Sequence, residues 1–288
     1  MLRDEGYEVE HQAPLGYRLL EFDDRIIGAE VSHGLATRIV GTRIIVLDQV
    51  TSTNDIAWQE ALRGAPDGTV IVAEEQTAGR GRMGRSWQAP AHSSLLISII
   101  LRAPLKADQG DLLTVMSAVA VAQALRENLP LQARIRWPND IMIKGRKVAG
   151  ILLEGRVLDA ASAFVIGIGL NVSTEKDDFP PELRDIATSL ALETEKTPNR
   201  IAVMQWVLRS LDVWYRQLRL GEYGDIACRW RELSSTLGQR VVLAEAGNEY
   251  RGTVLDLSLE DGLIVRLDGG MTKVFPPSTV TLRQPNNA

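Results

Sequence analysis

The chain has 288 residues, of which 45% are hydrophobic and 24% are charged. These values are ordinary for a globular protein, and they exclude collagen-like, coiled-coil and largely disordered classes. The formal net charge is -5 at pH 7, so any nucleic-acid surface would have to be a local patch. Length alone predicts about two domains.

Cys228 is the one cysteine of the sequence. An intrachain disulfide and a cysteine-based zinc site are therefore both excluded. This usage is typical of the reducing cytoplasm, where we expect the protein to reside. The longest apolar-rich stretch, 112–125, is too short to span a bilayer and predicts a buried helix. The polar N-terminus lacks the pattern of a signal peptide, so we expect no membrane partner.

The first predicted elements are two short extended segments within residues 6–21, on either side of a turn at 13–16. They form a hairpin that is too small to be a domain, because two strands alone are marginally stable in water. We therefore interpret residues 1–25 as part of a module whose remainder would lie upstream of Met1.

Residues 40–234 mix strands and helices without a regular strand–helix–strand alternation. Ser52, with Asp55 three positions later, resembles a capping box at the start of a helix. The order of elements predicts an α+β fold with a central mixed sheet and helices on one of its faces. We expect strands at 43–47, 69–73, 94–101, 133–137, 141–143, 147–153 and 163–168, and helices at 52–62, 112–125, 199–220 and through Trp230.

Residues 236–284 differ in composition from the rest of the chain. Short strands broken by glycine-containing turns are expected at 240–243, 250–257, 263–267, 272–275 and 280–282. Strands of this length and spacing are typical of a small β-barrel.

The strongest local signal is the segment 75–87, in which Gly79, Gly81 and Gly84 match G-x-G-x-x-G. A dinucleotide-binding fold requires a helix after such a loop, but Pro90 and another strand follow here. A kinase glycine-rich loop lies between strands, yet the sequence contains neither H-R-D nor D-F-G. Both interpretations therefore fail on their context.

The same loop carries Arg80, Arg82 and Arg85. Guanidinium groups are planar, permanently charged donors for carboxylate or phosphate, and glycine lets a ligand approach the backbone closely. The alternative interpretation is a solvated polar turn. Three glycines and three arginines so close together favour an anion site.

Two further segments place polar groups at strand positions. Asn139 and Asp140 follow Trp137-Pro138 at a strand end, where they can meet a metal-bound polyphosphate or a polar ligand edge; the alternative is an ordinary turn. Lys147 lies in an otherwise apolar strand, although most lysines are simply surface residues.

The remaining candidates are a glycine-containing strand and a helix start. Residues 166–172 read I-G-I-G-L-N-V, so a flat ring could lie on the glycine backbone beside Asn171; the alternative is an edge strand with a bulge. Residues 51–54 place hydroxyls and an amide at a helix start, and an ordinary cap is the alternative there.

The sequence offers no enzymic nucleophile of a known pattern. His11, His33 and His92 lack close spacing and partner carboxylates, and no G-x-S-x-G occurs. Cys228 is expected to be a packed thiol. The cationic loop and polar strand ends therefore suit a reaction in which ATP activates a carboxylate, by positioning and charge neutralisation.

Five motifs in a fixed order resemble one family. They are S-T-N, E-x-Q-T-A-G-R-G-R-x-G-R-x-W, W-P-N-D, K-x-A-G-I-L-x-E and G-I-G-L-N-V. This order resembles the biotin protein ligase family, also called the biotin–acetyl-CoA-carboxylase ligase family, over about residues 41–283. The resemblance implies a class II synthetase-like catalytic domain at 40–234, an SH3-like barrel at 236–284, and the wing hairpin of a winged helix at 1–25.

The activity that the resemblance implies is ATP-dependent ligation of biotin to a specific lysine of a biotin carboxyl carrier domain. Its intermediate is biotinyl-5'-AMP, and the carrier protein is the implied partner. Mg²⁺ is implied to enter with ATP, without a metal site made by protein side chains alone.

The resemblance also implies a role for individual residues. It assigns catalysis to Arg80, Arg82 and Lys147, and we hypothesise that Asp140 orients or deprotonates the incoming lysine, because it adjoins a nucleotide contact. Residues 173–190 are implied to order over the adenylate. Biotin contacts are implied for Ser52, Thr53, Asn54, Gln76, Arg80, Gly81, Arg82, Lys147 and Gly150, and ATP or adenylate contacts for Arg82, Arg85, Trp87, Asn139 and Asn171.

Three questions stay open at the level of sequence. Many bacterial members of the family carry recognition helices that read an operator, and no such helices precede the hairpin here, so we expect no operator binding. Homodimers are common in the family, but no pattern in this sequence indicates one. The alternative functions are an acyl transfer like that of lipoate ligase or octanoyltransferase, and a ligand-sensing repressor without catalysis.

Overall fold

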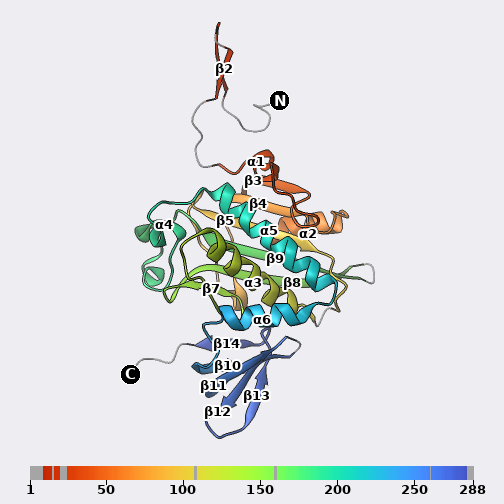
Figure 1. The fold of residues 1–288 in the computed structure, drawn as a ribbon, viewed down its shortest axis with the longest axis vertical. Helices are drawn as coiled ribbons and strands as arrows, with labels where there is room; N and C mark the ends of the chain where they lie inside the picture. Colours follow the sequence, from red (N-terminus) through yellow and green to blue (C-terminus); the bar gives the residue numbers. More distant parts are fainter. Residues whose placement is uncertain are drawn as a thin grey trace.

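The computed structural model describes residues 9–14, 16–19, 25–106, 109–158, 161–259 and 261–283. Three sheets lie along its long axis (Figure 1): an N-terminal hairpin, a seven-stranded sheet with helices, and a five-stranded C-terminal sheet. No helix among these residues is long and apolar enough to cross a membrane.

The predicted N-terminal hairpin is present as β1 (Val9–Gln12) and β2 (Gly16–Leu19), which pair antiparallel. A short helix, α1 (Gly28–Ser32), follows it and was not predicted. The parts of the expected module at residues 1–8 and 20–24 lie outside the described residues.

The central sheet is mixed, as predicted. Its strand order is β3-β4-β5-β9-β8-β7-β6, with β3 and β4 parallel and every other neighbouring pair antiparallel. The apolar runs of the sequence form these strands at nearly the expected positions. The bounds are β3 Ile44–Val50, β4 Val70–Gln76, β5 Ser94–Leu101, β6 Arg134–Arg136, β7 Asp140–Ile143, β8 Arg146–Leu158 and β9 Ala161–Asn171.

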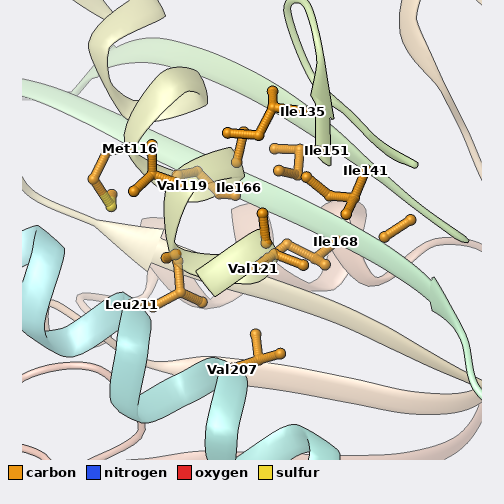
Figure 2. Close-up of a cluster of buried hydrophobic side chains, with 14 of the residues drawn as sticks. Met116, Val119, Val121, Ile135, Ile141, Ile151, Ile166, Ile168, Val207 and Leu211 are labelled. Atoms are coloured by element: carbon orange, nitrogen blue, oxygen red, sulfur yellow. The ribbon is translucent and has the colours of Figure 1, made fainter. Parts of the chain in front are cut away.

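Three helices cover one face of this sheet: α3 (Asp111–Asn128), α5 (Arg200–Arg219) and α6 (Tyr223–Leu233). Helix α3 lies between the sheet and α5, which explains why its apolar residues extend around most of its circumference. Figure 2 shows this core, in which α3 contributes Val119 and Val121 and α5 contributes Val207 and Leu211.

The prediction that all helices lie on one face is wrong, because α2 (Thr53–Leu62) packs on the opposite face. Its Ala57 and Trp58 form a second buried cluster with Ile71 of β4 and Ile100 of β5. These strands are apolar on both sides, and successive side chains of a strand point to opposite faces, so both faces must be covered.

The C-terminal sheet has the strand order β13-β12-β11-β10-β14, with all neighbours antiparallel. It joins the rest of the chain beside β6, where the Trp137 N–H donates to Thr236 Oγ1 at 3.0 Å. All strands predicted in this region are confirmed. The bounds are β10 Arg240–Glu245, β11 Asn248–Ser258, β12 Gly262–Leu267, β13 Thr272–Phe275 and β14 Val280–Arg283.

The packing of α5 predicts a contrast between two neighbouring positions. Leu211 is 2% exposed in the core, whereas Val213 is 50% exposed. Leu211→Ala should lower the free energy of unfolding by about 2–5 kcal/mol, because it leaves a cavity that the helices and sheet only partly close. Val213→Ala should change it by less than about 0.5 kcal/mol. Urea denaturation checks both; equal effects would contradict this packing.

Candidate active site

A pocket of about 460 Å³ lies among the start of α2, the end of β4, the interior of β8 and β9, and the glycine- and arginine-rich loop. It collects residues from segments that are more than a hundred positions apart in the sequence. Its lining is Ser52, Thr53, Asn54, Gln76, Arg80, Gly81, Arg82, Trp87, Ile97, Asn139, Lys147, Gly150, Ile151, Leu152, Gly167, Ile168 and Gly169.

Glycines form the floor of this pocket. A Cβ at Gly167 would lie 2.5 Å from Asn54 Oδ1, and a Cβ at Gly169 would lie 2.3 Å from Cε2 of Trp87. Gly150 pairs with Gly169 across β8 and β9, and a Cβ there would lie 3.1 Å from Trp87 Cζ3. Only glycine allows the loop and the helix start to approach the sheet so closely.

The start of α2 forms the polar wall of the pocket. Gln76 Oε1 accepts hydrogen bonds from the Thr53 N–H at 2.7 Å and from the Thr53 hydroxyl at 3.0 Å. Ser52 is the N-cap residue, but its side chain makes no cap hydrogen bond. The predicted capping box is therefore wrong, because a side chain from β4 binds a free N–H of the first turn and Asp55 pairs elsewhere.

Arg80 is fastened to this helix start. Its guanidinium donates to both carboxylate oxygens of Asp55, at 2.9 and 2.7 Å, and to Glu154 Oε1 at 3.3 Å. The bonds from Arg80 hold the pKa of Asp55 below its ordinary value, and the Asp55 carboxylate raises the pKa of Arg80. Arg80 therefore stands at the pocket rim as a fixed cation.

Arg82 connects the loop to the C-terminal sheet. It donates to Asn139 Oδ1 at 3.2 Å, to the Pro277 carbonyl, and to the Val280 carbonyl at 3.4 Å. Burial lowers its pKa, but a guanidinium stays charged in proteins. Arg85, the third arginine of the loop, is exposed and does not line the pocket.

Lys147 provides a third cationic group. Its Nζ lies 2.6 Å from Asp140 Oδ1 and 5.5 Å from the centroid of the Trp87 ring. Asp140 itself does not line the pocket. Asn139 is buried, and its Nδ2 donates to the Ile151 carbonyl at 2.7 Å.

Asn171 lies farther along β9 and outside the pocket lining. Its Nδ2 donates to the Thr188 carbonyl at 3.0 Å. The Lys147 N–H also donates to the Ile186 carbonyl, and the Thr188 N–H donates to the Lys147 carbonyl, both at 2.8 Å. The end of the 173–190 segment is thus joined to β8 at the residue that supplies a cation to the pocket.

Two polar neighbours of the pocket were missed at the level of sequence. Ser98 donates to Asn54 Oδ1 at 2.6 Å, and Glu154 accepts from Asn54 Nδ2 at 3.1 Å. The signals were a serine within an apolar strand and the glutamate that ends K-x-A-G-I-L-x-E, which lies on the same face of β8 as Gly150.

The site can hold an anion but offers no ready metal cage. Arg80, Arg82 and Lys147 all line one pocket, whereas no group of three or more His, Cys, Asp or Glu in the described part of the chain could hold a metal ion. A ligand with a flat polar part and an acidic end fits this arrangement, with the flat part beside the polar start of α2.

Comparisons with known proteins identify the family. Residues 46–171 match the Biotin/lipoate A/B protein ligase family. The chain is 36% identical over 275 residues to the bifunctional ligase/repressor BirA of Bacillus subtilis, with 95% of this chain and 85% of that protein covered. The chain belongs to the biotin protein ligase family.

Two further members of the biotin protein ligase family agree with this. The biotin–acetyl-CoA-carboxylase ligase of Mycobacterium tuberculosis is 33% identical over 279 residues, covering 94% of this chain and 97% of that protein. The structure of the Aquifex aeolicus biotin protein ligase in complex with biotin and ATP matches with a TM-score of 0.73 and 28% identity, covering 85% of this chain and 100% of that chain.

The glycine floor predicts the effect of adding one methyl group. Gly169→Ala places a Cβ against the Trp87 ring, so the ring must move and the free energy of unfolding should fall by about 1–3 kcal/mol. Tryptophan fluorescence should change as Trp87 leaves the floor. Gly224→Ala on α6 is the control, because a Cβ there meets open space. Unchanged stability and fluorescence in the Gly169 variant would contradict this description.

Proposed function

We propose that this chain ligates biotin to a lysine of a biotin carboxyl carrier domain, using ATP and forming biotinyl-5'-AMP. The observation that carries the proposal is the glycine-floored pocket, with neutral polar groups on one side and three cations at its rim. Biotin has a flat polar ring at one end and a carboxylate at the other. The activities named for the Bacillus and Mycobacterium relatives support the same function.

The pocket suggests which groups serve which end of biotin. We assign its ring to the buried helix start and Gln76, since hydroxyl and amide groups match a ureido ring. The acidic end is assigned to the cations at the rim. The proposed biotin contacts are Ser52, Thr53, Asn54, Gln76, Arg80, Gly81, Arg82, Lys147 and Gly150, and the proposed ATP or adenylate contacts are Arg82, Arg85, Trp87, Asn139 and Asn171.

The proposed reaction has two steps. A carboxylate oxygen of biotin attacks the α-phosphorus of ATP and pyrophosphate leaves; the lysine amine then attacks the carbonyl of the mixed anhydride and AMP leaves. Arg80, Arg82 and Lys147 offset the negative charge that develops. Mg²⁺, bound to the phosphates of ATP, would neutralise further charge there.

Asp140 is proposed to act in the second step. Its Oδ1 is bonded to Lys147 Nζ at 2.6 Å, so the carboxylate is held beside a group that lines the pocket. A carboxylate in this position can accept a proton from an incoming amine or orient it.

The domain arrangement is proposed on the same basis. Residues 40–234 would form a class II synthetase-like catalytic domain, residues 236–284 an SH3-like barrel, and residues 1–25 the wing hairpin of a winged helix. The five-stranded antiparallel C-terminal sheet supports the barrel. Repressor activity, which is part of the Bacillus relative's name, requires DNA contacts that we do not assign to this chain. Its single cysteine supports a cytoplasmic location.

Transfer of labelled acids to a purified carrier domain tests this function. Biotin should be transferred in an ATP-dependent reaction, while lipoate and octanoate should not, because the polar wall matches a ureido ring. Preferred transfer of lipoate or octanoate would indicate the acyl-transfer alternative. Failure to transfer any acid would leave a ligand sensor without catalysis.

The role of Asp140 predicts a difference between the two steps. Asp140→Asn should form biotinyl-adenylate at the normal rate but modify the carrier about a hundredfold more slowly, since it lacks a proton acceptor. Pyrophosphate release measures the first step, and transfer from preformed adenylate measures the second. A slow first step with normal transfer would contradict this assignment.

A further inference from the structure

Glu154 collects three hydrogen-bond donors beside the pocket without lining it. Its Oε1 accepts from Asn54 Nδ2 at 3.1 Å and from Arg80 at 3.3 Å, and its Oε2 accepts from Trp58 Nε1 at 2.8 Å. The side chain is 25% exposed. Glu154 and Lys147 are the polar residues of the K-x-A-G-I-L-x-E motif, and only Lys147 lines the pocket.

The bond to Glu154 fixes the orientation of the Asn54 amide. An ionised carboxylate can only accept hydrogen bonds, so it selects the NH₂ end of the amide. The oxygen end then points away, where it accepts from Ser98 Oγ at 2.6 Å. Of the amide atoms, Oδ1 is also nearest to the position that a Cβ of Gly167 would occupy, at 2.5 Å. An acceptor therefore faces the glycine floor.

Burial leaves this amide little freedom to reorient. Asn54 is 3% exposed, and its two ends are bonded to groups on different strands, Ser98 on β5 and Glu154 on β8. An amide turned over would place NH₂ against the pocket floor and an oxygen against a carboxylate. The contact between the amide oxygen and the carboxylate is unfavourable, because two acceptors would then face each other in a buried site.

We propose that Glu154 is a positioning residue for biotin recognition, which orients the Asn54 amide so that its oxygen accepts a hydrogen bond from a ring N–H of biotin. This inference rests on the proposed biotin ligation. The Glu154 carboxylate, which does not line the pocket, would thus make the site selective for biotin over biotin that is methylated on a ring nitrogen.

The Asp55 carboxylate provides a matched comparison. It binds Arg80 through both oxygens at 2.7 and 2.9 Å, but the structure gives it no bond to Asn54. Removing its charge disturbs Arg80 and leaves the amide orientation alone. An effect that acts through Arg80 can thus be separated from one that acts through Asn54.

Glutamine at position 154 cannot accept from all three of these donors. The carboxylate offers two accepting oxygens to three donors, whereas glutamine offers one oxygen and an NH₂ that faces a donor in either orientation. If the glutamine oxygen accepts from Trp58 Nε1, Asn54 Nδ2 has no acceptor at position 154. Trp58→Phe removes the competing donor while keeping an aromatic ring beneath Arg156, which stacks on it at 4.4 Å.

The experiment compares biotin with biotin methylated on a ring nitrogen, using biotin-dependent exchange of labelled pyrophosphate into ATP. The two acids carry the same carboxylate, so an effect that acts through Arg80 changes both alike. It therefore cancels in the ratio of kcat/KM for biotin to kcat/KM for methylated biotin. Glu154→Gln should lower this ratio about tenfold, with a raised KM for biotin and an unchanged KM for ATP. Asp55→Asn should leave the ratio unchanged.

Rescue completes the test. The double variant Glu154→Gln with Trp58→Phe should recover most of the wild-type ratio, because glutamine can then turn its oxygen to Asn54. Glu154→Asp has a shorter side chain that withdraws the carboxylate, so it should lower the ratio as Glu154→Gln does. If Glu154→Gln does not fold, Glu154→Asp provides the test. A wild-type ratio in both Glu154 variants, or an equal loss in Asp55→Asn, overturns the inference.

The wild-type protein separates this inference from the function on which it rests. Biotin-dependent exchange by wild type supports the proposed ligase, and a wild-type ratio in the Glu154 variants then overturns the positioning role alone. Absence of biotin-dependent exchange in wild type overturns the proposed function and with it the role of Glu154.

Discussion

The pocket depends on the absence of side chains at Gly167 and Gly169 of β9. Strand residues two positions apart point to the same face of a sheet, so these two glycines open one continuous area of bare backbone. Asn54 lies directly on the first and Trp87 on the second. Any side chain at either position would push the helix start or the loop away from the sheet. The two glycines thus let α2 and the arginine-rich loop approach the sheet, and the pocket lies among these three parts of the fold.

A second property follows from how the polar groups around this floor are held. Thr53 is bonded to Gln76, Arg80 to Asp55, and Lys147 to Asp140. The two ion pairs are partly exposed, and such pairs contribute little to stability. A bound anion can therefore share these cations with the carboxylates that already hold them in position. Fixed charges of this kind stabilise developing charge without rearrangement.

Arg82 extends this arrangement to the C-terminal sheet. Its guanidinium contacts backbone carbonyls of Pro277 and Val280 as well as Asn139. The loop that borders the pocket is thus fixed at one end to Asp55 on α2 and at the other to a separate sheet, so that neither part of the fold positions the loop alone.

Much of this could be predicted from the sequence, because local patterns decide where strands and helices form. The strand 94–101 and the helix over 112–125 follow directly from apolar runs and their length. The face that α2 covers was predicted wrongly, since it depends on which strands become neighbours. The pairing of Arg80 with Asp55 and of Glu154 with Asn54 was missed for the same reason. The first pair is 25 positions apart in the sequence and the second is 100 positions apart. No local pattern encodes such contacts.

The most direct test is a structure of the protein determined with biotin bound. We expect the ureido ring to lie beside the start of α2, next to Asn54, with the carboxylate toward Arg80, Arg82 and Lys147. Asn54 and Trp87 should keep their places on the glycine floor. Biotin bound elsewhere, or bound with Trp87 and Asn54 lifted off the glycine floor, would contradict this expectation.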